Sequence, residues 1–174
     1  MAAGATVWAA AEAPDLIRGM IMVGPFVRGD GNKLLEAVFT VMLARPWGPS
    51  MWLKYFSTLY PTRKPNDFSE YTSALQANLK EPGRLDTLLA MLRASKRASE
   101  ERIPNVEKPV LVLMGSKDPD FKDPEAEAKW VADNLKGTYT LIEGAGHYPH
   151  TEMHETTAPL MLEFIRSVNG NKEN

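Results

Sequence analysis

The 174-residue sequence has a formal net charge of −2, with charged residues of both signs along its length, and 44% of its residues are hydrophobic. This balance lacks the basic stripe that a nucleic acid requires, and no stretch reaches the roughly 18 apolar residues that cross a bilayer. The absence of cysteine excludes disulfides, thiolate zinc sites and a cysteine nucleophile, and it fits a reducing compartment. We expect a globular protein of the cytoplasm that binds neither nucleic acid nor membrane.

The N-terminal part predicts a helix followed by a strand. Residues 1–12, MAAGATVWAAAE, are rich in alanine, which favours a helix, and Pro14 and Asp15 end the run. The run GMIMVGPF, residues 19–26, is short, apolar and bounded by glycine. Such a run is expected of a strand that is buried on both faces.

Residues 27–104 differ because they contain no convincing strand. Apolar residues recur there at helical spacing, and prolines separate the runs. The runs predict helices at 32–44, 50–60, 67–79 and 84–101. Many aromatic residues in this segment form either a small helical core or the apolar wall of a substrate pocket beneath a lid. The candidate pocket residues, some of them outside the segment, are Phe26, Trp47, Trp52, Phe56 and Tyr148.

The strand pattern returns in the C-terminal part. PVLVLM at 109–114 and TYTLI at 138–142 are short apolar runs next to glycine, as expected of two more buried strands. Between them Asp123, followed by proline, predicts a helix start, with Gly137 just past the helix end. A last amphipathic helix is expected over about residues 155–168.

This alternation of strands and helices predicts an α/β fold, with about three parallel strands flanked by helices. The helical segment is an insert in that fold. We expect residues 1–26 and 105–174 to form the α/β core and residues 27–104 to form the all-helical insert.

All three histidines lie in one stretch, GAGHYPHTEMH. His150 and His154 are expected to be solvated or to lie at a helix start. His147 follows a predicted strand end through two glycines, and sites gather at the carboxyl ends of parallel strands, so it is the candidate general base. We expect no metal, because the tight GAG loop presents one imidazole rather than a ligand set at fixed spacing.

A candidate acid follows the neighbouring predicted strand. Asp118 lies three residues after Gly115, so its carboxylate would lie beside His147 if the two strands are neighbours. A buried acid there fixes the tautomer of the imidazole and stabilises its protonated form. Asp120 is the alternative acid, and turn chemistry alone also explains either aspartate. Asp123 is assigned to the helix cap.

The motifs GSKD at 115–118 and GAGH at 144–147 resemble the acid and base motifs of the α/β-hydrolase superfamily, in that chain order. The resemblance implies that Asp118 is the acid, that His147 is the base and that the helical insert is the cap domain of a capped enzyme. It also implies a serine hydrolase that needs no cofactor and acts on an ester-like or other small apolar acyl substrate.

The sequence contains no G-x-S-x-G elbow, which carries the nucleophile in this family. The resemblance places Met1 just after the nucleophile, at an oxyanion-hole position, so we expect the C-terminal part of such an enzyme, beginning one residue after its serine. An aspartate nucleophile, as in epoxide hydrolases and haloalkane dehalogenases, and a non-catalytic fragment are the alternatives. Loss of the preceding strands would expose the strand at 20–23 as a sheet edge and favour self-association.

Overall fold

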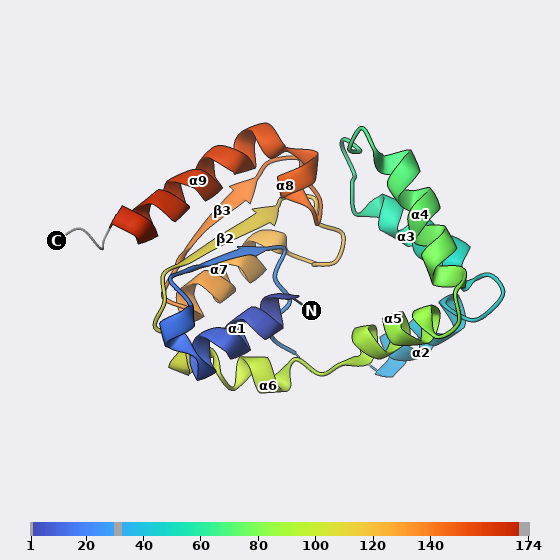
Figure 1. The fold of residues 1–174 in the computed structure, drawn as a ribbon, viewed down its shortest axis with the longest axis horizontal. Helices are drawn as coiled ribbons and strands as arrows, with labels where there is room; N and C mark the ends of the chain where they lie inside the picture. The colour runs from blue at the N-terminus through green and yellow to red at the C-terminus, as the bar shows by residue number, and fades with distance from the viewer. Residues whose placement is uncertain (1, 30–32, 171–174) are drawn as a thin grey trace.

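A computed structural model describes residues 2–29 and 33–170, so Met1 lies outside the described residues (Figure 1). Its centre is a sheet of three parallel strands in the order β1-β2-β3. The strands are β1 (Met20–Val23), β2 (Val110–Gly115) and β3 (Thr138–Ile142). The α/β fold with about three parallel strands, expected from the sequence, is thus present.

Helices cover both faces of this sheet. On one face α1 (Ala2–Glu12) and α7 (Pro124–Asn134) pack on the alternate β2 side chains that begin at Val110, in the larger core cluster. On the other face α9 (His154–Gly170) packs on the intervening β2 side chains, such as Leu113. Strand β2 is buried along its whole length, as expected of a central strand with helices on both sides.

The helices between β1 and β2 form a group beside the sheet (Figure 1). They are α2 (Lys33–Met42), α3 (Gly48–Thr58), α4 (Phe68–Lys80) and α5 (Arg84–Arg93). Leu43, Leu79 and Leu85 form the centre of their own apolar core. The short α6 (Arg97–Glu100) instead packs near α1, and the expected helix over 84–101 is wrong, because Ala94 turns to an extended conformation and ends α5.

The helix ends show which local signals work. Asp123 caps α7 as expected, since its carboxylate accepts a hydrogen bond of 2.9 Å from the Ala126 N–H. At the other end the left-handed residue is Lys136 with φ 53°, and Gly137 has a different role. A Cβ at Gly137 would lie 2.5 Å from the Val110 carbonyl oxygen, so this glycine allows two chain segments to approach closely.

The C-terminal helix begins earlier than expected. A separate short helix α8 (Pro149–Glu152) follows the GAGH loop, and α9 begins at His154. The 3₁₀ turns at Pro14–Leu16 and Ile103–Asn105 complete the regular elements. Within the described ranges no helix has both the length and the apolar character needed to cross a membrane.

Candidate active site

The carboxyl ends of β2 and β3 lie side by side, and each leads into a loop with a candidate residue. Gly115 is paired with Ile142 at the end of the parallel ladder. The loops that follow bring Asp118 and His147 together, with 2.8 Å between His147 Nδ1 and Asp118 Oδ2. The Asp118 side chain is 0% exposed and that of His147 is 13% exposed. The juxtaposition expected from the sequence is therefore present.

Gly115 is the reason that the two loops can touch. A Cβ at this position would lie 2.1 Å from the Gly146 carbonyl oxygen and 2.3 Å from that of Ala145, which leaves room only for hydrogen. The Lys117 N–H also donates to the Ala145 carbonyl at 2.9 Å. Backbone contacts between the two loops thus limit the distance between Asp118 and His147.

The hydrogen bonds of Asp118 favour one tautomer of His147. Asp118 Oδ1 accepts from the Asp120 N–H at 3.0 Å, while Oδ2 faces His147 Nδ1. A neutral imidazole that donates its Nδ1–H to a carboxylate carries its lone pair on Nε2. This tautomer is the one that a general base needs.

Asp120, the alternative acid, lies farther from the imidazole. Its Oδ2 is 3.7 Å from His147 Nδ1, and its Oδ1 accepts a hydrogen bond from the Tyr55 hydroxyl. Burial raises the pKa of Asp120, and it also raises the pKa of Tyr55, so the phenol keeps its proton and remains a donor. The geometry favours Asp118 as the partner of His147.

Aromatic side chains surround the imidazole. The Phe26 ring lies 5.5 Å from the His147 ring, and the Tyr148 ring lies 5.0 Å from it, nearly perpendicular. At the end of β1, Gly24 has φ 51°, and a Cβ there would lie 2.9 Å from the imidazole carbon Cε1. The carboxyl ends of all three strands therefore meet at His147.

Next to Tyr148 lies a cavity of about 340 Å³. Its lining includes five aromatic side chains and three polar ones, which are Phe56, Tyr60, Phe68, Tyr71 and Tyr148 with Asp67, His150 and Thr151. Burial raises the pKa of Tyr148 to about 12, so its hydroxyl is neutral at ordinary pH. The cavity is mostly apolar and is lined by aromatic rings, and one of its residues, Tyr148, directly follows His147 in the sequence.

Two of the predicted pocket residues, Phe56 and Tyr148, line this cavity, and the other three do not. Phe26 stacks on Phe121 beside the imidazole. Trp47 is 50% exposed and donates its indole N–H to the Val41 carbonyl, whereas Trp52 packs into the helical core. Neither tryptophan therefore lines this cavity, and the packing of Trp52 follows the helical-core alternative that the sequence left open.

The other two histidines lie apart from the Asp118 contact. His150 lies in α8 and lines the cavity beside Tyr148, and desolvation, followed by the charge of His147, lowers its pKa. His154 begins α9, and its side chain is 72% exposed with Glu155 at 3.3 Å. Both lie at helix starts, as the sequence suggested.

Asp118, Asp120 and His147 also form a group whose potential ligand atoms all lie within 4.8 Å of one another. The closest two atoms are only 2.8 Å apart, which is a hydrogen-bond distance. Two ligands of a tetrahedral zinc ion would be roughly 3.3 Å apart, given metal–ligand bonds near 2.0 Å. The arrangement fits a hydrogen-bonded acid and base better than a metal site.

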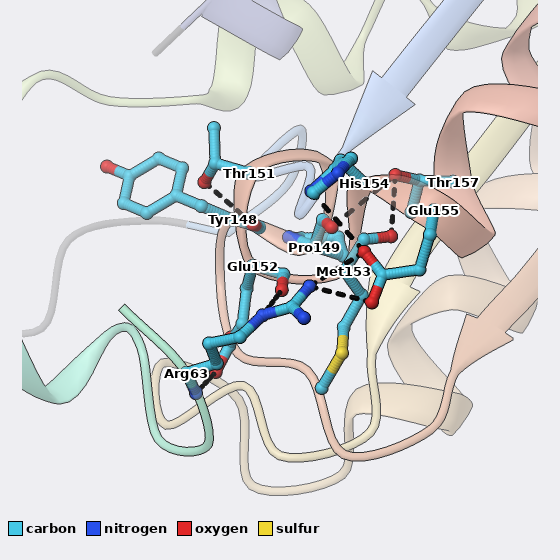
Figure 2. Close-up of polar contacts among 9 residues, drawn as sticks. All are labelled: Arg63, Tyr148, Pro149, Thr151, Glu152, Met153, His154, Glu155 and Thr157. Carbon is cyan, nitrogen blue, oxygen red and sulfur yellow. Dashed lines mark hydrogen bonds and ion pairs between the residues drawn. The ribbon is translucent and has the colours of Figure 1, made fainter. Parts of the chain in front are cut away.

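Sequence reasoning missed one residue near the base. Glu152 is 0% exposed, and its carboxylate accepts hydrogen bonds from the backbone N–H groups of Thr62, Arg63 and Gly146. Figure 2 shows Glu152 beside Arg63. No motif signals it, since an isolated glutamate in a loop is ordinarily solvated.

Comparison with known proteins identifies the family and the fold. Residues 2–154 match the family model of the serine aminopeptidases, S33. No curated protein sequence is a significant match. Among solved structures, 2-hydroxy-6-oxo-6-phenylhexa-2,4-dienoate hydrolase from Rhodococcus sp. strain RHA1 is similar with a TM-score of 0.75 and 14% identity, over 95% of this chain and 61% of that one.

Two further similar structures are the esterase from Exiguobacterium antarcticum and a hydrolase from Oleispira antarctica. The esterase has a TM-score of 0.75 and 16% identity over 94% of this chain and 63% of its own. The hydrolase has a TM-score of 0.71 and 16% identity over 95% of this chain and 62% of its own. The chain thus spans about three fifths of the length of these relatives and forms part of their fold. Its match over residues 2–154 shows that it belongs to the serine aminopeptidase S33 family of α/β hydrolases.

Proposed function

We propose that these residues carry the acid and the base of a hydrolase that cleaves an ester or a similar small apolar acyl substrate. The observation that carries the proposal is the hydrogen bond between buried Asp118 and His147, at the carboxyl ends of adjacent strands. In this proposal Asp118 orients the imidazole, and His147 Nε2 takes a proton from the nucleophile and returns it to the leaving group.

The proposed nucleophile is a serine. No G-x-S-x-G elbow occurs among the 174 residues, so the proposal requires a nucleophile from outside them. Attack would form a tetrahedral intermediate and an imidazolium at His147, which the Asp118 carboxylate stabilises by its charge and its hydrogen bond. In the second step His147 would take a proton from the attacking water and return it to the serine oxygen as the acyl-enzyme bond breaks.

The cavity beside Tyr148 supports an apolar substrate. The Phe56 and Tyr148 rings are 5.9 Å apart and line a space whose wall, among the residues that the structure describes, includes no lysine or arginine. A flat or aliphatic group would displace water from these rings, which is favourable in proportion to the apolar area removed from water. We propose that one side of the substrate occupies this cavity while its carbonyl lies beside His147.

Hydrolysis of p-nitrophenyl esters tests the proposal. A protein that joins these residues to a preceding segment with a G-x-S-x-G elbow is expected to hydrolyse these esters. In that protein His147→Ala is expected to lower kcat by about 10³-fold or more. His154→Ala, at an exposed histidine, is the matched control and is expected to keep the activity.

The acid is tested in the same assay. Asp118→Asn is expected to reduce kcat far more than Asp120→Asn, because only Asp118 bonds to the imidazole at short distance. Turnover that survives His147→Ala, or a larger loss in the Asp120 variant, would show that the roles are wrongly assigned.

A further inference from the structure

Glu152 is fully buried, and among the described residues its carboxylate accepts hydrogen bonds from three backbone N–H groups. Its Oε1 accepts from the Thr62 N–H at 2.7 Å and the Arg63 N–H at 2.8 Å, and its Oε2 accepts from the Gly146 N–H at 2.7 Å. Burial of a charged carboxylate is costly unless such donors compensate it, and hydrogen bonds to an ionised acceptor are among the strong ones. The three hydrogen bonds therefore fix the position of the Glu152 carboxylate, and they also restrain the backbone segments that carry the N–H groups.

The donors come from two distant segments of the chain. Thr62 and Arg63 lie in the connector between α3 and α4, whereas Gly146 lies in the loop after β3. Gly146 is the residue directly before His147, so the bond to Oε2 fixes the backbone from which the imidazole projects. Glu152 thus joins the helical group to the loop of the base.

The same two segments contact each other directly. The His147 N–H donates to the Leu59 carbonyl at 3.0 Å, and the Thr62 hydroxyl donates to the Gly144 carbonyl at 2.6 Å. A Cβ at Gly146 would lie 2.3 Å from the Leu59 carbonyl oxygen. With so little room, the backbone position of His147 depends on where the connector lies.

Arg63 ties the glutamate further into this arrangement. Its Nε donates to the Glu152 carbonyl oxygen at 2.9 Å, and its guanidinium makes a two-pronged ion pair with the exposed Glu155 at 2.7 and 2.8 Å (Figure 2). The hydrogen bond to Glu155 raises the pKa of Arg63. Glu155 also pairs with Arg63, but its carboxylate is exposed and accepts from the Arg63 side chain rather than from the backbone N–H groups that Glu152 holds, so it offers a matched control.

We propose that Glu152 is a positioning residue for His147, which sets the imidazole against Asp118 by holding the Gly146 N–H and the α3–α4 connector on one carboxylate. The role of His147 as the base rests on the proposed function, whereas the position of its imidazole is independent of that function. An experiment that needs no turnover therefore separates the two proposals.

The test compares Glu152→Gln with Glu155→Gln in the 174-residue chain by NMR. Glutamine has nearly the size of glutamate but replaces one acceptor oxygen with an N–H₂ group. The hydrogen bonds of that oxygen, either to Thr62 and Arg63 or to Gly146, are therefore lost. We expect the His147 Nδ1–H resonance to shift or broaden, and the Gly146 amide to exchange about tenfold faster or more, while Val112 in the central strand is unchanged. Glu155→Gln is expected to leave all these signals as in the unmutated protein.

A folded Glu152→Gln variant with an unchanged His147 resonance would overturn the proposal. If that variant does not fold, hydrogen exchange in the unmutated chain decides the question. Amides held by one carboxylate open together, so Thr62, Arg63 and Gly146 are expected to show matching protection. Independent exchange of the Gly146 amide from the other two would equally refute the assignment.

Discussion

Asp118 and Asp120 are two residues apart, yet their surroundings differ. Asp118 is bonded to the imidazole and to a backbone N–H, both suited to a carboxylate. Asp120 is bonded to the Tyr55 hydroxyl, and desolvation is the largest influence on its pKa, which is raised. Hydrogen bonds from His147 and from a backbone N–H therefore stabilise the carboxylate of Asp118, whereas burial disfavours the charged form of Asp120.

The raised pKa of Asp120 predicts a pH dependence of stability. Its folded pKa lies above the ordinary value of about 4, so the folded state binds this proton more tightly than the unfolded state. The free energy of unfolding contributed by this group then falls as the pH rises from about 4 through the folded pKa. Asp120→Asn removes this titration, so its stability relative to the unmutated protein is expected to increase over that range.

Denaturant unfolding at a series of pH values measures this difference. Asp15→Asn, at an exposed carboxylate, is the control and is expected to give a smaller pH-dependent difference. A difference between the Asp120 variant and the unmutated protein that is constant with pH, or that changes in the opposite direction, would contradict the prediction.

At the scale of elements, the sequence predicts what local patterns determine. The apolar runs next to glycine give β2 and β3, and because parallel strands end at one edge, the acid and the base follow. Tertiary contacts determine the rest. The burial of Glu152 and the places of the tryptophans could not be predicted. Two of the three donors to Glu152 lie about ninety residues away in sequence, and an aromatic residue packs wherever the helices leave space.

The contact between the β2 and β3 loops predicts that Gly115→Ala is destabilising. The atoms nearest to the new Cβ would be backbone atoms of Ala145 and Gly146, which cannot move aside without shifting the loop that carries His147. We expect a loss of about 1–3 kcal/mol in the free energy of unfolding, as for overpacked cores. Gly170→Ala is the control, because a Cβ there meets no atom within 4 Å and alanine favours helix. Equal stability of the two variants would show that the loops are not tightly packed.

At the scale of the whole molecule, the site depends on segments that are far apart in the sequence. Gly24, Asp118 and His147 come from the ends of three strands, and Tyr55 and the connector after α3 come from the helical group. The contact of the connector with the base loop makes the helical group part of the site. A displacement of the connector is therefore expected to reach the imidazole through the backbone contacts and through the Glu152 carboxylate.

The outer edge of β1 leads to a prediction about association. Within residues 2–29 and 33–170, β1 pairs with β2 and has no strand on its other side. The N–H groups of Met20 and Gly24 point toward β2, where they donate at 2.9 and 3.0 Å, so those of Ile21 and Val23 point to the open edge. An edge of this kind pairs readily with another chain. We propose that the 174-residue chain self-associates through β1, and that Ile21→Pro weakens this association by removing an edge N–H without breaking the ladder.

Sedimentation velocity over a range of concentrations measures the association. The matched control is Ile21→Val, which keeps the N–H and the preference for strand, and it is expected to associate like the unmutated chain. Thermal unfolding of Ile21→Pro shows whether the fold is kept, because the ladder bonds from Met20 and Gly24 remain available to it. A monomer at every concentration, or a folded Ile21→Pro variant that associates as strongly as Ile21→Val, would rule out the β1 edge as the contact.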